Sequence, residues 1–360
     1  MKASVISAVL AALPCTLASP TWPPPKPGHG WGNGPKDKYP GLAVLAKKAG
    51  LLYFGTAIDN VVLDNKAYVA IAHNKSEFNQ VTPSNGQKWM YIEPQRNVFN
   101  YTAGDQIIVP GRKAGQISRG HTFIWHNQLP EWLTSRNWTK PELTQILENH
   151  IKNEARYYYD TYAWDVVNEA FNDDGTWRET IWLKILGKSY IELAFKFARK
   201  YTHPKTRLYY NDYGIERVNN KSRAVAELVK DFNKRGVPID GVGLQAHFTV
   251  GRAPSYNDTR SALALFEALG VETALTELDV RTPVPSNATL VAQQASVYAA
   301  SVKACVDSKD CVGVTVWDFW DPVSWVPETF PGFGEATLFD VNLKRKPAYY
   351  AISDMLREYD

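Results

Sequence analysis

The sequence is short of cysteine and of net charge, and each shortage excludes a class of protein. Three of the 360 residues are cysteines, and only Cys305 and Cys311 remain after the N-terminal signal described below, which leaves too few ligands for a structural zinc site. The 40 Lys and Arg residues nearly balance the 37 Asp and Glu residues, so the net charge is only +3. Since no basic run accompanies this balance, the sequence predicts neither a nucleic-acid partner nor a membrane partner.

Two patterns that would hold a cofactor or an ion are also missing. No glycine-rich phosphate turn follows the first apolar run, where Gly55-Thr56 is followed by AID. The acidic stretch NDDG (172–175) lacks the spaced ligands of a calcium loop, and we expect it to form a polar turn. We therefore predict a protein with no cofactor and no metal.

The N-terminus has the three parts of a secretory signal peptide, in residues 1–18. Lys2 supplies the positive region, Val5 to Leu13 form the apolar stretch, and Thr-Leu-Ala is the small-residue cleavage site. The apolar stretch is too short to span a membrane, and a buried N-terminal helix is the alternative. We predict a secreted, extracellular protein from which Cys15 is removed with the signal.

The two remaining cysteines, Cys305 and Cys311, lie close together in the sequence. In an oxidising compartment such a pair favours one small-loop disulfide, with two free buried thiols as the alternative. Six Asn-x-Ser/Thr triplets fit a secreted eukaryotic glycoprotein, although such triplets also arise by chance. They begin at Asn74, Asn100, Asn137, Asn220, Asn257 and Asn287.

Residues 19–40 are rich in Pro, Gly and Trp, a composition that cannot form a core. We predict a stiff extended linker there. No comparable break follows, so residues 41–360 are predicted to form a single domain. The 12 Trp and 19 Tyr residues indicate an aromatic core or stacking platforms for flat apolar faces, such as those of sugar rings.

Short runs of β-branched and aromatic residues recur along this domain, and most are separated by segments with apolar residues at helical spacing. Strand and helix alternate eight times, and the runs are apolar throughout, which is the pattern of an α/β fold of the (β/α)8 TIM barrel type. An open doubly wound sheet alternates similarly and is the alternative. The runs cover 52–59, 78–83, 120–125, 163–169, 207–212, 239–247, 273–280 and 313–319, and the clearest helical segments cover 141–159, 189–201, 221–236 and 288–305.

Nearly every predicted strand ends in side chains that hydrogen-bond, ionise or stack. The strands of a parallel barrel end at one mouth, where active sites lie, so we expect these side chains to meet there. In chain order they are Lys88, Trp89, Trp125, His126, Gln128, Asn168, Glu169, Asn211, Asp212, Tyr213, Gln245, His247, Glu277, Asp279, Trp317 and Trp325.

Two glutamates in this set, Glu169 and Glu277, belong to the fourth and seventh strands, which lie roughly opposite one another in a barrel. Two facing carboxylates can cleave a glycosidic bond, because one protonates the leaving oxygen while the other attacks or activates water. A structural salt bridge at each glutamate is the alternative. The neighbouring aromatic and amide residues favour the catalytic hypothesis.

Eight motifs occur in order after the linker. They are VTPSNGQKW (81–89), GHTFIWHNQLPEW (120–132), WDVVNEA (164–170), YYNDYG (209–214), GVGLQAH (241–247), TELDVR (276–281), VWDFWDPVSW (316–325) and KPAYYAI (346–352). Together they resemble glycoside hydrolase family 10, the retaining endo-β-1,4-xylanases, over essentially the whole predicted domain. The pair Cys305 and Cys311 also resembles a disulfide common in that family.

The resemblance implies that Glu169 is the acid/base and Glu277 the nucleophile of a retaining enzyme. Their carboxyl groups would lie about 5 to 5.5 Å apart, and a covalent glycosyl-enzyme intermediate would form. Asn168 would hydrogen-bond the 2-hydroxyl of the sugar under attack. His247 would hold Glu277 ionised, and Asp279 would orient that histidine, although a histidine beside an apolar strand is more often a core residue.

The resemblance also implies a set of sugar-binding residues along the cleft. Some match residues that hold sugars on the non-reducing side of the scissile bond, two match aromatic walls of the central subsite, and one matches a stacking residue on the leaving side. The residues on the non-reducing side are Lys88, His121, Trp125 and Gln128. The aromatic walls are Trp317 and Trp325, and the stacking residue is Tyr213. Asn85 and Gln245 complete the set. Trp22, Trp31 and Trp177 match no site, and we expect packing or linker roles for them.

The motif of the second predicted strand, VTPSNGQKW (81–89), departs from the family pattern, which commonly reads TPEN followed by a small residue and Met. Ser84 stands where a glutamate usually binds the sugar two places from the cleavage point, and Gly86 and Gln87 alter the same loop. Losing a hydrogen bond to a charged group would weaken that subsite by about 1 to 3 kcal/mol. The catalytic residues are unaffected, but the choice of substrate stays open.

Three hypotheses about function remain. The first is a secreted, monomeric endo-1,4-β-xylanase that hydrolyses internal bonds of plant xylan by double displacement. The second is a member of the same family that acts on another β-linked glycan or on the oligosaccharide of a plant glycoside such as a saponin, as Ser84 suggests. The third is a non-catalytic barrel that serves as a lectin or an inhibitor.

Overall fold

The computed structural model describes residues 39–360. The predicted signal peptide (1–18) lies outside the described residues, as does all but the end of the predicted linker (19–40), so both stay predictions. The described part begins with α1 (Leu42–Lys48) and ends with a short 3-10 helix, Arg357–Tyr359.

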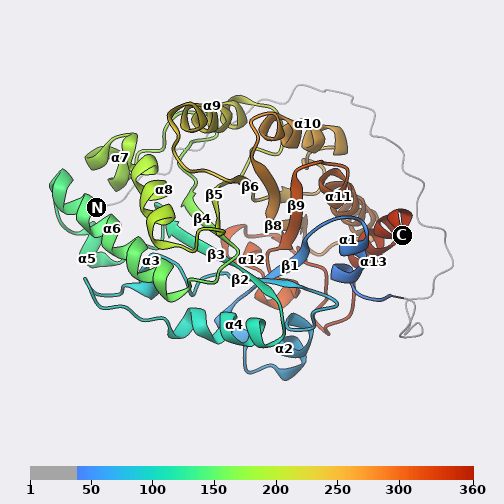
Figure 1. The fold of residues 1–360 in the computed structure, drawn as a ribbon. Coiled ribbons are helices and arrows are strands. Elements are labelled where there is room, and N and C mark those ends of the chain that lie inside the picture. The colour runs from blue at the N-terminus through green and yellow to red at the C-terminus, as the bar shows by residue number, and fades with distance from the viewer. Residues whose placement is uncertain (1–38) are drawn as a thin grey trace, which may run out of the picture. The chain divides into compact units, whose positions relative to one another are not determined.

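Parallel strands form a closed barrel in the described part of the chain (Figure 1). Each barrel strand pairs with the next barrel strand along the chain, and the last pairs with the first through Gly313 and Tyr53. The prediction of a (β/α)8 barrel is therefore confirmed, and the open sheet was the wrong alternative. The barrel strands are β1 (Tyr53–Ile58), β2 (Gln80–Pro83), β3 (Ile117–Ile124), β4 (Ala163–Asn168), β5 (Arg207–Asp212), β6 (Gly241–Leu244), β8 (Glu272–Pro283) and β9 (Cys311–Val316).

The barrel strands are buried on both faces, and inside the barrel large residues lie opposite small ones. Tyr53 and Tyr209 lie inside the barrel, fully buried together with Ala163 and Ala274. A Cβ atom on Gly313 would lie 2.6 Å from the ring of Tyr53, and one on Gly241 would lie 2.5 Å from the ring of Tyr209. Glycine at these two positions therefore leaves space for the two rings.

Helices surround the barrel strands, and the four helical segments expected from the sequence are present (Figure 1). Reciprocal hydrogen bonds between a capping residue and the third helical residue mark several starts, as at Thr139 and Glu142 before α6. The other helices are α2 (Lys66–Ala72), α3 (Trp89–Ile92), α4 (Thr102–Lys113), α5 (Glu131–Thr134), α6 (Lys140–Tyr157), α7 (Ile181–Leu186), α8 (Ser189–Tyr201), α9 (Asn220–Arg235), α10 (Tyr256–Glu267), α11 (Ala288–Val306), α12 (Val326–Thr329) and α13 (Pro347–Leu356).

The predicted strand 239–247 is divided in two in the structure. β6 ends at Leu244, and a separate short strand, β7 (His247–Thr249), pairs with the outer part of β8. Between them Ala246 has a φ of 63°, in the left-handed region, so the chain turns there. β8 is also longer than predicted and continues beyond the barrel, where it pairs with β10 (Phe333–Gly334).

A disulfide joins Cys305 near the end of α11 to Cys311 at the start of β9, with a Cα–Cα distance of 5.2 Å. The disulfide prediction is confirmed, and the alternative of two free thiols was wrong. All six predicted glycosylation asparagines are exposed, and none of them lies in a strand. Whether they carry glycans stays a prediction.

Candidate active site

The two predicted catalytic glutamates lie at the mouth of the barrel. Glu169 directly follows β4, and Glu277 lies in β8, three strands further round the ring. Both are largely buried, with side-chain exposures of 12% for Glu169 and 6% for Glu277. The more exposed glutamate is the one that the resemblance assigns to proton exchange.

A chain of side-chain amides connects the two carboxylates. Asn211 on β5 donates through Nδ2 to Oε1 of Glu277 at 2.7 Å and to Oδ1 of Asn168 at 2.9 Å. Gln245 donates through Nε2 to the same Asn168 oxygen at 3.1 Å and to Oε1 of Glu169 at 3.0 Å. The two carboxylates therefore share one polar network whose members come from four neighbouring strands or strand ends.

Asn211 was not among the residues singled out as catalytic or sugar-binding, and a glycine creates its place. A Cβ atom on Gly243 would lie 2.2 Å from Oδ1 of Asn211, so only glycine fits opposite it in β6. Thr276 donates its hydroxyl to that same oxygen at 2.6 Å, which leaves Nδ2 facing Glu277. The position of Asn211 at the end of a predicted strand was the feature of the sequence that indicated a place in the site.

His247 lies between two carboxylates. Its Nε2 is 3.1 Å from Oε2 of Glu277, and its Nδ1 is 2.9 Å from Oδ2 of Asp279, as the pairing of β7 with β8 allows. Burial alone would lower the pKa of His247, but Asp279 and Glu277 outweigh it and raise the pKa to about 10. The ring is therefore an imidazolium at neutral pH that donates to both carboxylates.

Glu277 is held in its ionised form. Burial would raise the pKa of its carboxyl, but the charges of His121 and His247 and the hydrogen bonds from His247 and Asn211 outweigh burial and lower that pKa. A carboxylate that is buried and yet ionised is suited to attack an electron-poor carbon.

Glu169 has an unusual backbone, with a φ of 59°. Its amide N donates to the carbonyl of Asn211 at 2.9 Å, and its own carbonyl accepts from Nε of Arg178 at 2.9 Å. Its Oε2 lies 3.8 Å from Nδ1 of His126, whose pKa is lowered by burial. These contacts hold the side chain where β4 opens into the mouth.

Four of the predicted sugar-binding residues form one cluster. Asn85 accepts hydrogen bonds at Oδ1 from Nζ of Lys88 at 3.0 Å and from Nε2 of Gln128 at 3.2 Å. Nζ of Lys88 lies 4.8 Å from the centre of the Trp125 ring. Asp59, at the end of β1, accepts from Nδ2 of Asn85 at 2.6 Å and was missed, although its strand ends in a carboxylate.

Burial lowers the pKa of Lys88 to about 8, against the opposing effects of Glu277, Glu169 and Asp59. At neutral pH the ammonium group therefore still carries its charge for most of the time. Ser84, the residue that departs from the family pattern, is buried in the same loop. Its hydroxyl lies 3.1 Å from both the carbonyl of Ile58 and Oδ2 of Asp59, so it is engaged within the protein.

A buried ion pair on the side away from the mouth holds His121 in position. Its Nδ1 lies 3.0 Å from Oδ2 of Asp165, whose other oxygen accepts from Nη2 of Arg119 at 2.7 Å. The same His121 nitrogen is 3.9 Å from Oε1 of Glu277. Asp165 and Arg119 were also missed, because they lie within strands and below the mouth.

Aromatic rings line the same region. The ring of Trp325 lies 4.8 Å from that of His247, and its Nε1 donates to Oδ2 of Asp279 at 2.7 Å. The ring of Trp317 lies 5.1 Å from His121. Tyr213, on the loop after β5, accepts at its hydroxyl from Nη2 of Arg178 at 2.9 Å.

Not every residue at a strand end belongs to this site. Trp89 is buried and stacks on His150 with ring centres 3.6 Å apart, so it is a core residue. Asp212 is buried against Lys221, which lies 2.8 Å away. Trp177 packs on Phe171, as expected, whereas Trp22 and Trp31 lie outside the described residues.

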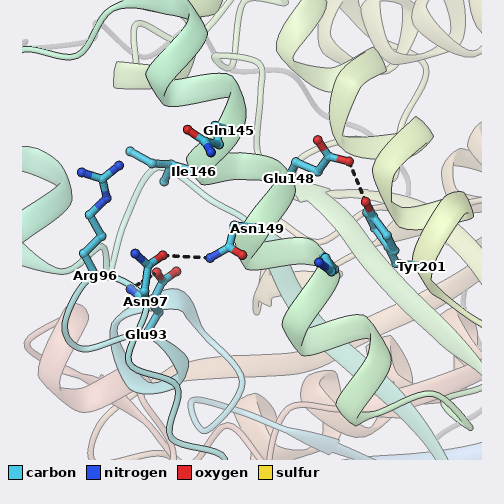
Figure 2. Close-up of a pocket in the computed structure, with 9 residues that line it drawn as sticks. Glu93, Arg96, Asn97, Gln145, Ile146, Glu148, Asn149 and Tyr201 are labelled. Atoms are coloured by element: carbon cyan, nitrogen blue, oxygen red, sulfur yellow. Dashed lines mark hydrogen bonds between the residues drawn. The ribbon is translucent and has the colours of Figure 1, made fainter.

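A cavity of about 350 Å³ lies beside α6 (Figure 2). Its polar side chains are bonded to one another, since Asn149 donates to Asn97 at 3.0 Å and Tyr201 donates to Glu148 at 2.6 Å. None of the predicted site residues lines it. The residues that do are Glu93, Arg96, Asn97, Gln145, Ile146, Glu148, Asn149, Lys152 and Tyr201.

Neither a metal-binding cluster nor a membrane-spanning helix is present in residues 39–360. No group of three or more His, Cys, Asp or Glu side chains in that range is arranged to hold a metal ion. In the same part of the chain, every helix is too short or too polar to cross a membrane.

The parallel barrel, with two connected carboxylates at a mouth lined by amides and indole rings, defines a glycoside hydrolase. Residues 41–355 match the model of Glycosyl hydrolase family 10. The chain belongs to this family.

Similar proteins that have been named or whose structures have been solved support this assignment. The chain is 46% identical over 313 residues to endo-1,4-beta-xylanase A of Phanerodontia chrysosporium, covering 87% of this chain and 76% of that protein. The Penicillium canescens endo-1,4-beta-xylanase XylE is 42% identical with a TM-score of 0.85, over 88% of this chain and 98% of that one. The GH10 xylanase from Bispora sp. MEY-1, solved with xylobiose, is 39% identical with a TM-score of 0.85, over 88% of this chain and 99% of that one.

Proposed function

We propose that this glycoside hydrolase is a retaining endo-1,4-β-xylanase that cleaves internal bonds of xylan. The observation that carries the proposal is the amide network that connects Glu169 to Glu277 through Gln245, Asn168 and Asn211. Relatives named endo-1,4-beta-xylanase and a similar structure solved with xylobiose support xylan as the substrate.

In the first step Glu277 attacks the anomeric carbon. Its carboxylate oxygen forms a bond to that carbon while the bond from carbon to the leaving oxygen breaks, and Glu169 donates its proton to that oxygen. The lowered pKa of Glu277 keeps the nucleophile ionised, and the His247 imidazolium holds it in place. The product of this step is a glycosyl ester on Glu277.

In the second step water cleaves this ester. Glu169, now a carboxylate, takes a proton from the water while the water oxygen attacks the anomeric carbon and Glu277 leaves. The change of role is possible because the ester carries no charge, so the repulsion that favoured protonated Glu169 has disappeared. Two inversions restore the original configuration.

The remaining residues of the mouth bind and orient the sugar chain. Asn168 presents its amide beside both glutamates and is the proposed partner of the 2-hydroxyl of the sugar under attack. Asn85, Lys88 and Gln128 form the polar part of the non-reducing side, against the ring of Trp125. On the other proposed side of the cleavage point, Tyr213 is positioned by Arg178.

A product profile on xylan, with NMR of the first-formed anomer, tests substrate, endo action and retention together. We expect xylo-oligosaccharides of mixed length at early times, with the β-anomer formed first. Formation of the α-anomer first would contradict the mechanism. A lack of hydrolysis of any glycan by the wild type would favour the non-catalytic lectin or inhibitor instead. Full activity of Glu277→Gln would contradict the role of Glu277 as the nucleophile.

Ser84 favours a second candidate with the same chemistry, an enzyme for another β-linked glycan or for a plant saponin. Its hydroxyl is hydrogen-bonded inside the protein, so the second-strand loop offers no carboxylate from this position. Turnover of xylohexaose, cellohexaose and a steroidal saponin separates the two candidates. Hydrolysis of the saponin without hydrolysis of xylohexaose would replace the first proposal with the second.

We also propose that the protein is secreted, glycosylated and monomeric. The N-terminal pattern of residues 1–18, the disulfide and the exposed Asn-x-Ser/Thr triplets support secretion. Mass spectrometry of the protein from the medium, before and after glycosidase treatment, tests cleavage near Ala18 and the glycans. Light scattering after gel filtration tests the monomer.

A further inference from the structure

The strand that carries the proposed nucleophile continues outward from the mouth. Side chains on a strand alternate between faces, so Glu277, Asp279 and Arg281 share one face of β8. At roughly 3.3 Å per residue, Arg281 lies about 13 Å along the strand from Glu277. β7 runs beside it, with His247 paired to Asp279 and Thr249 paired to Arg281.

Arg281 is connected to the proposed aromatic wall of the cleft. Its guanidinium lies over the ring of Phe330, 3.7 Å from the centre, and the Phe330 ring lies 5.4 Å from that of Trp325. Trp325 in turn bonds to Asp279 and contacts His247. One face of the guanidinium is therefore covered by an aromatic ring, which fixes its plane and leaves the N–H donors at its edge.

The guanidinium of Arg281 has no carboxylate partner within residues 39–360. No hydrogen bond or ion pair of this side chain occurs there, although the residue is partly buried. Burial and the nearby charge of Arg252 lower its pKa, whereas Asp279 raises it. A partly buried guanidinium without a carboxylate of its own keeps its N–H donors available to bind an anion.

A second arginine adds to the positive charge at this place. Arg252 is exposed on the loop after β7 and likewise makes no side-chain ion pair in the described chain. Arg217 holds this loop by donating to the carbonyls of Arg252 and Ala253 at 3.1 and 2.6 Å. Arg217 has its own partner, because its Nε lies 3.6 Å from Asp258.

We propose that Arg281, with Arg252 beside it, forms a subsite for the carboxylate of a uronic acid branch on the polysaccharide. The flat guanidinium fork matches a carboxylate in a bidentate arrangement. Its position beyond Trp325 and Phe330 suits a branch on a sugar outside the reacting centre. The inference rests on the proposed function and extends it to the class of xylan that the enzyme prefers.

A matched pair of substrates tests this subsite. One is a xylo-oligosaccharide with a glucuronic acid branch, and the other is the same compound after its carboxyl is reduced to an alcohol, so the branch keeps its ring and linkage but loses its carboxylate. The readout is the ratio of kcat/KM for the acidic substrate to that for the reduced one, in which a general loss of activity cancels. For the wild type we expect a ratio well above one that falls towards one as salt is added.

Variants of the full-length protein assign the preference to a residue. Arg281→Gln is expected to lower the ratio about 5- to 30-fold, as for loss of a charge-assisted hydrogen-bond pair, and Arg281→Lys is expected to lower it less. Arg252→Gln is expected to lower it to a smaller extent. Arg112→Gln, which removes an exposed arginine from α4, is the control and is expected to keep the wild-type ratio.

Each other outcome overturns the inference. A wild-type ratio of one, or an unchanged ratio in Arg281→Gln, would show that no such subsite exists. If Arg281→Gln does not fold, the other two variants decide. An unchanged ratio in both Arg281→Lys and Arg252→Gln would also show that no such subsite exists. If the wild type hydrolyses neither substrate, the proposed xylanase function fails first, whereas hydrolysis of both without preference removes only this inference.

Discussion

Asn211 donates a hydrogen bond of 2.7 Å to Oε1 of Glu277, within the part of the barrel that is closed to solvent. The amide is held in this orientation because its oxygen accepts from Thr276, and because Gly243 leaves space for it. This bond helps to lower the pKa of Glu277 against the effect of burial. Asn211 is therefore a positioning residue for the proposed nucleophile.

Asn211→Ala should lower kcat/KM on xylohexaose about 10- to 100-fold, since a hydrogen bond to a charged group contributes about 1.5 to 3 kcal/mol. The acidic limb of the pH profile should also move to higher pH, because Glu277 loses a group that favours its ionised form. Thr276→Val, which only loosens the amide, should shift the limb less. An acidic limb in Asn211→Ala that coincides with that of the wild type would contradict this role.

His247 should make stability depend on pH in the alkaline range. Its folded pKa of about 10 lies above the value of about 6.5 expected in the unfolded chain. The folded state therefore binds the proton more tightly, and this contribution is complete below pH about 6.5 and declines as the pH rises to about 10. The measurement is the free energy of unfolding in urea, at several pH values, for the wild type and His247→Gln.

The difference in unfolding free energy between these two proteins should shrink steadily from about pH 6.5 to about pH 10. Arg112→Gln, on the exposed face of α4, serves as the control for the general pH dependence of the protein. Parallel curves for the wild type and His247→Gln would mean that the imidazolium does not bridge Glu277 and Asp279 in solution.

Ser84 and its neighbour Asn85 should behave differently when truncated. The hydroxyl of Ser84 is used by Ile58 and Asp59, so Ser84→Ala should cost about 1 kcal/mol of stability and change kcat/KM by less than about 3-fold. Asn85 holds Lys88 and Gln128 together, so Asn85→Ala should lower kcat/KM on xylohexaose about 10- to 100-fold. Equal losses of activity in the two variants would show that Ser84 contacts the sugar directly.

The sequence was sufficient to predict the barrel and the strands that carry Glu169 and Glu277. Buried parallel strands are apolar throughout, and an abrupt change to polar residues marks the point where a strand reaches the mouth. The same criterion selected Trp89, which stacks on His150 in the core. A strand end shows where a residue lies along the barrel axis but does not show which way its side chain points.

The partners of these residues could not be predicted for a different reason. Asp165 and Arg119 lie inside strands, and their ion pair is read only once the register of β3 and β4 is known. The division of the predicted strand 239–247 at Ala246 depends on one left-handed residue without a glycine to signal it. Contacts between strands that are distant in sequence follow from the register, which the pattern of one chain does not supply.

The disulfide between Cys305 and Cys311 should stabilise the fold without affecting the chemistry. It closes a short loop, with a sequence separation of 6, between α11 and β9. A loop of that length restricts the unfolded chain by about 2 kcal/mol in the chain-entropy model. The double variant Cys305→Ser with Cys311→Ser should therefore lose about 2 kcal/mol of unfolding free energy in urea.

Reduction of the wild type with dithiothreitol should give the same loss, and the reductant should leave the double variant unchanged. At 25 °C the double variant should keep the wild-type kcat/KM, because Cys311 lies at the start of β9 and the mouth lies at the other end of that strand. A drop in kcat/KM at a temperature where the double variant is fully folded would mean that the loop before β9 positions Trp317, which lies just after that strand. In that case the disulfide would contribute to the geometry of the site as well as to stability.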